Sequence, residues 1–316
     1  MDRRKLKIVL RIGISCLFIG YLLKKVDISA LVSALSGTNL VLYLLSTLLA
    51  VLSSLFLACK YYLLIKDSVI KQSMLSLFKI NFITRFYALF LPTAVGRDVV
   101  RWIKVTRNQY GRSLFLASII FERLTFFFLL ICFGSIPLFF YDSISRIAIL
   151  RMRIMPISIL SLAIASILIS FFILPPIQSF IKKLIHIVFA RRWKDLDIDA
   201  IIDDITLKNM KSSFYIYVFG LGLVWQLFFI GRLYALIAAT ALPLNVLDVA
   251  WMGSLVLLLQ TIPISFAGIG IREGAYAYLF TLFGLPPEKG VVIGILFFFQ
   301  MLIMAFAGGV LEFTGK

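Results

Sequence analysis

The sequence predicts an all-α polytopic membrane protein, with about six full transmembrane helices and two re-entrant broken hairpins in a single domain, residues 1–316. Two observations concern composition. The chain is 61% hydrophobic, with a mean hydropathy of +1.02. Only 15% of its residues are charged, whereas soluble domains carry about 25%. The third observation is a series of apolar runs, each near the length of about 20 residues that a helix needs to cross a bilayer.

Six apolar segments are expected to cross the membrane. They are 8–23, 39–59, 113–140, 154–174, 212–231 and 291–311. Two further segments, about 73–95 and 246–285, are interrupted by Pro and Gly or end beside them. We expect each to enter the membrane and return to the side it came from, and the two to enter from opposite sides. That is the pattern of an inverted repeat, in which two broken segments meet near the midplane at a substrate site.

The distribution of positive charge indicates the orientation. If both interrupted segments are re-entrant, the N-terminus, the stretch 60–112, the loop 175–211 and Lys316 share one side, which then carries most of the Lys and Arg residues. The positive-inside rule makes this side, with both termini, cytoplasmic. The net charge of +17 therefore reflects loop topology and contact with anionic lipid rather than nucleic-acid binding. Within the basic loop 175–211, residues 180–193 are expected to lie as an amphipathic helix on the membrane surface.

Three pairs of adjacent charges lie at or near membrane depth, namely Arg97-Asp98, Glu122-Arg123 and Arg272-Glu273. A charge at the centre of a membrane helix costs roughly 2.5–3.5 kcal/mol, so these side chains must face one another, water or a ligand. Neighbours in a helix do not face each other, which favours partners from other segments. The candidate partners of Glu122 are Arg97 and Arg272. Those of Arg123 are Asp98 and Glu273.

Two interpretations of these charges stay open. In the first, they are internal salt bridges that hold helices together. In the second, the arginines form a basic cavity for phosphate, with the acids as resting counter-ions, because the planar guanidinium donates two parallel hydrogen bonds to phosphate. Glycines allow positive φ and close backbone approach, and free amides at the start of the next half-helix would favour an anion. The predicted substrate site is Arg97, Asp98, Glu122, Arg123, Ser265, Gly268, Gly270, Arg272 and Glu273.

The same residues carry a resemblance to a known family. Pro92 with Gly96-Arg97-Asp98, Phe121-Glu122-Arg123 and the stretch 263–274 resemble the lysylphosphatidylglycerol synthase/flippase transmembrane domain family of bacteria and archaea, also called flippase-like. The resemblance covers nearly the whole chain. It implies a plasma-membrane domain that moves a lipid headgroup between leaflets, such as an aminoacyl-phospholipid or a polyprenyl-phosphate-linked sugar. It also implies a separate lipid synthase or glycosyltransferase as a possible partner.

Three functions remain in competition. The first is a lipid flippase-like transporter, the second a non-transporting scaffold for a lipid-modifying enzyme, and the third a membrane-embedded lipid transferase. The sequence contains no phosphate-binding loop of the Gly-x-x-x-x-Gly-Lys-Ser/Thr type, which argues against direct use of ATP. Its single histidine, His186, falls in the surface loop, and its three cysteines show no metal-ligand spacing. We therefore expect neither a catalytic residue nor a cofactor or metal, and we favour the transporter.

Overall fold

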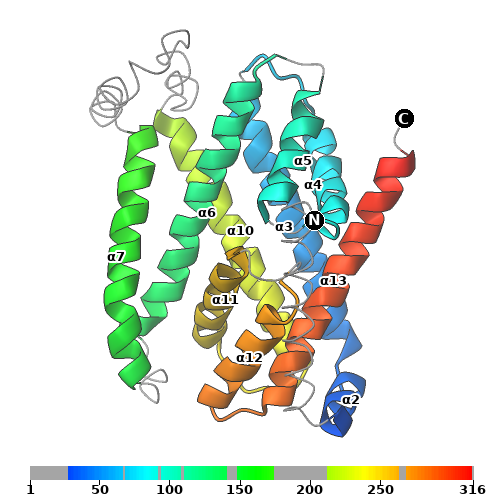
Figure 1. Cartoon of the computed structure of the whole chain (residues 1–316), viewed down its shortest axis with the longest axis vertical. Helices are drawn as coiled ribbons and strands as arrows, with labels where there is room; N and C mark the ends of the chain where they lie inside the picture. The colour runs from blue at the N-terminus through cyan, green and yellow to red at the C-terminus, as the bar shows by residue number, and fades with distance from the viewer. Residues whose placement is uncertain are drawn as a thin grey trace, which may run out of the picture.

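The computed structural model describes the chain with gaps, over residues 28–66, 68–91, 94–107, 110–140, 148–173, 212–262 and 268–314. Every regular element in these ranges is an α-helix, and the helices form one bundle (Figure 1). The helices are α2 (Ile28–Ser36), α3 (Leu40–Ile65), α4 (Met74–Ala88), α5 (Ala94–Thr106), α6 (Arg112–Phe140), α7 (Ala148–Ile173), α10 (Ser212–Ala238), α11 (Val246–Thr261), α12 (Ile271–Leu282) and α13 (Pro287–Thr314).

The long helices coincide with predicted membrane crossings. Four of them, α3, α6, α10 and α13, contain stretches long and apolar enough to cross a membrane. The 26 residues of α7 include most of the predicted span 154–174, and the predicted span 8–23 lies outside the described residues. The chain is therefore an all-α polytopic membrane protein, as its composition indicates.

Both interrupted segments are pairs of short helices. The helix α4 ends at Ala88, ahead of Pro92, and α11 ends at Thr261, ahead of Pro263. Ile262 already has extended backbone angles, φ −72° and ψ 122°, because a following proline disfavours the helical conformation. The helix α12 then begins after Gly270, whose φ is +85°, a conformation that glycine adopts without steric cost.

The chain has two halves with the same order of helix lengths. The helices α3, α4, α5 and α6 contain 26, 15, 13 and 29 residues, and α10, α11, α12 and α13 contain 27, 16, 12 and 28. The central contact joins α3 to α10, α4 packs on α13, and α11 packs on α6. Because α4 and α5 lie at one end of the bundle and α11 and α12 at the other (Figure 1), the halves are arranged as an inverted repeat. That the short helices re-enter the membrane stays a prediction.

Close contact between α13 and α4 depends on glycine. A Cβ added at Gly308 would lie 2.0 Å from the backbone oxygen of Phe82, so no larger residue fits without moving the helices apart. Small residues at helix interfaces allow such backbone approach in membranes. This contact ties α13, in the second half, to the first interrupted segment.

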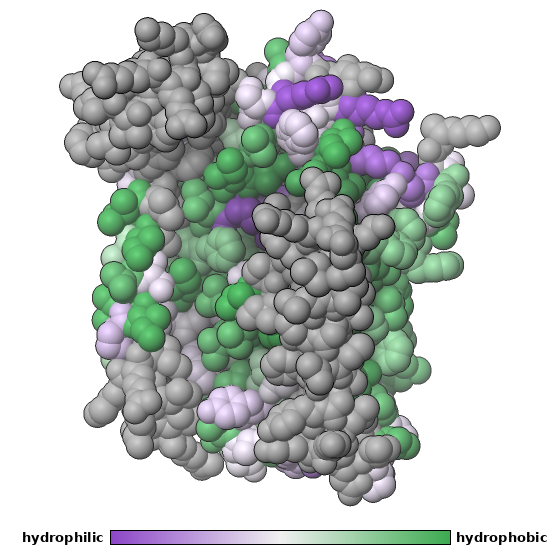
Figure 2. All heavy atoms as spheres, viewed as in Figure 1, coloured by the Kyte–Doolittle hydropathy of each residue, from purple (hydrophilic) through white to green (hydrophobic). Residues whose placement is uncertain are grey.

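Polar residues gather at one end of the bundle. Figure 2 shows hydrophilic side chains near the end occupied by α4 and α5, above a mostly apolar flank. The end of α3, the start of α6 and the end of α13 lie at this same end (Figure 1), consistent with the shared side expected for them. One assignment was wrong: the stretch 60–112 was assigned to the cytoplasmic side, but α3 continues to Ile65 and Lys60 lies inside the bundle, 2% exposed.

Candidate functional site

A polar cavity of about 210 Å³ is lined by residues of both interrupted segments. Helices from both halves line it. Among the described residues, its charged lining consists of six arginines and one carboxylate, namely Arg85, Arg97, Arg101, Arg123, Arg232, Arg272 and Glu122. Arg97 follows the first break and Arg272 the second, so the fold brings the two Arg-acid motifs to one cavity although they are far apart in sequence.

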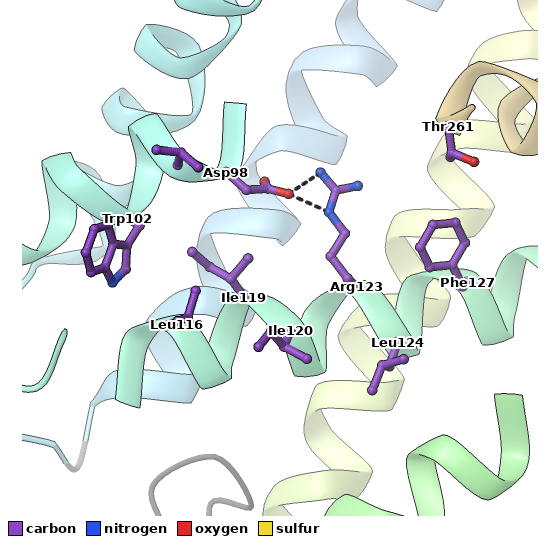
Figure 3. Close-up of a pocket in the computed structure, with 10 residues that line it drawn as sticks. Asp98, Trp102, Leu116, Ile119, Ile120, Arg123, Leu124, Phe127 and Thr261 are labelled. Carbon is purple, nitrogen blue, oxygen red and sulfur yellow. Dashed lines mark hydrogen bonds and ion pairs between the residues drawn. The ribbon is translucent and has the colours of Figure 1, made fainter. Parts of the chain in front are cut away.

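Asp98 is held by two arginines. Its Oδ1 accepts a hydrogen bond from Nη1 of Arg101 at 2.7 Å, one helical turn along α5. Its Oδ2 accepts from Nε of Arg123 at 2.7 Å and lies 2.5 Å from Nη2 of the same residue (Figure 3). The pairing of Arg123 with Asp98, one of the two predicted alternatives, is present. Arg101 is 3% exposed and was not among the predicted site residues.

Glu122 pairs with a lysine, not with an arginine of the interrupted segments. Its Oε1 lies 3.6 Å from Nζ of Lys60, and the hydroxyl of Tyr61 donates to its Oε2 at 3.4 Å. The expectation of Arg97 or Arg272 as its partner was wrong, because α6 turns this carboxylate toward α3. Lys60 also donates to Oγ1 of Thr125 at 2.7 Å, so its ammonium has two partners in the helix interface.

The second motif forms a local pair. Oε1 of Glu273 lies 2.5 Å from Nη2 of Arg272, so the expected alternative of Glu273 with Arg123 was wrong. Oε2 of Glu273 accepts from the backbone amide of Gly270 at 2.7 Å, which uses one of the amides expected to be free for an anion. Gly268 and Gly270 have φ values of +75° and +85°, the positive values expected of them.

Three cavity arginines have no carboxylate within ion-pair distance among the described residues. Arg85 donates to Oγ of Ser54 at 2.6 Å. Arg232 donates to Oε1 of Gln300 at 2.8 Å and lies over the ring of Phe297, 3.9 Å from its centroid. Arg97 makes no ion pair with the described part of the chain, and its buried Nε lacks a hydrogen-bond partner there.

The cavity therefore has an excess of positive charge. Among the described residues, the six lining arginines and Lys60 are seven cations, and the carboxylates in or next to the lining are Asp98, Glu122 and Glu273. At roughly 2.5–3.5 kcal/mol for each arginine left unpaired at membrane depth, three of them would cost an amount comparable with a typical total stability of about 5–15 kcal/mol. Water or an anion in the cavity would offset this cost.

Neutral polar residues surround these charges. Gln260 lines the cavity, and Gln300 joins Arg232 to Ser46, donating to its Oγ at 2.8 Å. Gln226 lies in a smaller space beside Lys60 and Glu122, and its buried amide has no partner in the described ranges. Ser265, a predicted site residue, lies outside the described residues.

Sequence reasoning missed part of the lining. Arg85, Arg101 and Arg232 come from α4, α5 and α10, and Lys60 stands behind Glu122. A signal existed for Lys60 and Arg232, because each closes a long apolar run. None existed for Arg101, which lies in a stretch rich in basic residues, whereas Arg85 lies inside the interrupted segment 73–95, where its charge was a signal that was not used.

Fold and site together define an integral membrane protein with a cationic cavity between two inverted halves. Residues 8–309 match the family described as Lysylphosphatidylglycerol synthase TM region, and the chain belongs to that family. This membership supports a membrane function related to lipids. No curated protein and no solved structure matches the chain.

Proposed function

We propose that the protein is a lipid flippase-like transporter, which moves an anionic or phosphate-containing lipid headgroup between leaflets through the Arg-lined cavity. The observation that carries the proposal is that Arg97 and Arg272, from the two interrupted segments, line one cavity with four further arginines. Arginine suits phosphate because its planar fork donates two parallel hydrogen bonds. A site between inverted halves also suits alternating access.

The charge balance supports an anionic ligand. Seven cations against three carboxylates leave the cavity positive, and Arg97 has no counter-ion among the residues described. A phosphate would supply the missing negative charge, whereas a neutral headgroup would not. Aminoacyl-phospholipids and polyprenyl-phosphate-linked sugars both contain this phosphate. A separate lipid synthase or glycosyltransferase would supply such a lipid at the cytoplasmic face of the plasma membrane.

Reconstitution tests the proposal against its two rivals. Purified protein is placed in phosphatidylcholine vesicles with a trace of headgroup-labelled phosphatidylglycerol, and the label in the outer leaflet is destroyed by a reagent that cannot enter. Transport predicts that label from the inner leaflet also becomes accessible. Chemical conversion of the lipid would indicate a transferase. Neither exchange nor conversion would favour a scaffold and contradict the proposal.

Arg97→Gln is the sharpest variant for this assay. It breaks no ion pair in the described part of the chain, so its effect reports on the ligand rather than on helix packing. We expect exchange to fall by roughly tenfold or more, the equivalent of about 1.4 kcal/mol of interaction. Arg107→Gln makes the same substitution at an exposed arginine and is the matched control. Equal exchange in the two variants would contradict the assignment of Arg97 to the headgroup site.

A further inference from the structure

An apolar groove of about 400 Å³ lies between α5, α6 and the end of α11 (Figure 3). One face of α6 forms its floor, because residues spaced by three or four positions lie on the same side of a helix. This face consists of Leu116, Ile119, Ile120, Leu124 and Phe127. Val99 and Trp102 of α5 and Thr261 of α11 also line it, and Asp98 and Arg123 are its charged residues. The groove is thus a separate, mostly apolar space beside the cationic cavity.

The outer side of the groove is open. The side chains of Val99, Leu116 and Ile120 are 47%, 46% and 38% exposed. On the flank of a bundle that crosses a membrane, such apolar side chains face lipid. A hydrocarbon chain can therefore enter sideways without leaving an apolar environment.

The inner end of the groove is charged and adjoins the cavity. Arg123 lines both spaces. On α5, Asp98 lines the groove while Arg97 and Arg101 line the cavity. The ion pair of Asp98 and Arg123 consequently stands between an apolar and a cationic compartment.

The ion pair uses the edge of Arg123 with which arginine also binds phosphate. Nε and Nη2 of Arg123 both lie against Oδ2 of Asp98, at 2.7 and 2.5 Å. An arginine presents the same two groups to a phosphate. A phosphate oxygen that took the place of Oδ2 would keep both contacts of Arg123, and Asp98 would keep its bond to Arg101.

We propose that the groove seats one hydrocarbon chain of an anionic phospholipid, whose phosphate displaces Asp98 from Arg123 and so enters the cavity. The proposal rests on the proposed function and adds the lateral route that connects bilayer and cavity. Charge complementarity selects the occupant, since an apolar slot that leads directly to a cluster of arginines matches a chain joined to a phosphate. A wholly apolar partner helix would leave Arg123 and its neighbours without an anion.

Photo-crosslinking tests the groove. The protein is reconstituted in phosphatidylcholine vesicles with phosphatidylglycerol that carries a photoactivatable group in one chain, and labelled peptides are identified by mass spectrometry. We expect labelling of the α6 face that contains Leu116 and Ile120 to exceed labelling around Ile216, an apolar residue of α10 that is 71% exposed. The excess should be smaller when the same chain is attached to phosphatidylcholine, because the choline cation is repelled by the arginines that bind the phosphate. Equal labelling of both faces by both lipids would identify surrounding bilayer lipid only and overturn the proposal.

A filling substitution separates this proposal from the proposed function. Ile120→Trp should occupy the groove and lower both groove labelling and phosphatidylglycerol exchange by roughly tenfold, while Ile216→Trp should leave both unchanged. If Ile120→Trp retains full exchange and full labelling while Arg97→Gln abolishes exchange, the groove is not the route and the transport function stands. If neither variant alters exchange, the headgroup site itself is wrong.

Discussion

Lys60 and Glu122 form a buried ion pair between α3 and α6 whose energy can be measured. Their side chains are 3% and 10% exposed, and Nζ lies 3.6 Å from Oε1. Lys60→Met keeps most of the volume but leaves Glu122 without a cation. Removing one member of a buried pair costs about 3–5 kcal/mol, because the other charge stays buried and uncompensated. We expect the free energy of unfolding to fall by this amount.

The double variant Lys60→Met with Glu122→Gln supplies the decisive comparison. It removes both charges, so we expect it to lie within about 1–2 kcal/mol of the wild type and to be more stable than either single variant. Unfolding of the purified proteins by dodecyl sulfate in mixed micelles, followed by circular dichroism, measures all four corners of the cycle. If the double variant loses as much unfolding free energy as the two single variants together, the two residues are not coupled. That result would refute the assignment of Lys60 as the counter-ion of Glu122.

Three further variants test helix packing, the displacement of Asp98 from Arg123, and lipid exchange. Gly308→Ala places a Cβ 2.0 Å from a backbone oxygen of α4, so the free energy of unfolding should fall by about 1–3 kcal/mol or more in the same assay. The control Gly220→Ala has nothing within 4 Å of the new Cβ and should be neutral or slightly stabilising. Equal losses of stability in the two variants would contradict the close contact of α13 with α4. Asp98→Asn weakens the hold on Arg123, so photo-labelling of the groove by phosphatidylglycerol should rise, and unchanged or lower labelling of folded protein would count against displacement. Arg272→Ala should abolish lipid exchange while the protein stays monodisperse in detergent, and a wild-type exchange rate would remove this residue from the site.

Helix positions could be predicted from local signals. Uncharged runs of about 20 residues indicate crossings, and a proline after an apolar run predicts the end of a helix, as at Pro92 and Pro263. The positive φ of Gly268 and Gly270 could likewise be anticipated, because glycine tolerates that conformation. All of these depend only on neighbours in the sequence, which is why they were predictable.

The partners of the buried charges could not be predicted in the same way. Glu122 pairs with Lys60 because the face of α6 that carries Glu122 packs against α3. Glu273 instead contacts its neighbour Arg272 and the backbone amide of Gly270. The choice depends on the rotation of each helix in the bundle, which many weak contacts decide together. For the same reason Arg101 lines the cavity without any signal in its own segment.

We propose that the arginines of the cavity bind the negatively charged phosphate of a lipid headgroup, so a lipid whose phosphate charge is not offset by a cation should pass fastest. The most direct test is the ratio of exchange rates for headgroup-labelled phosphatidylglycerol and phosphatidylcholine with identical chains, in vesicles that contain only this protein. We predict that the phosphatidylglycerol probe exchanges faster by roughly tenfold or more, and that the difference shrinks in Arg97→Gln. Equal rates for the two lipids in the wild type would contradict this proposal, because arginines attract an anionic headgroup and repel the cation of choline.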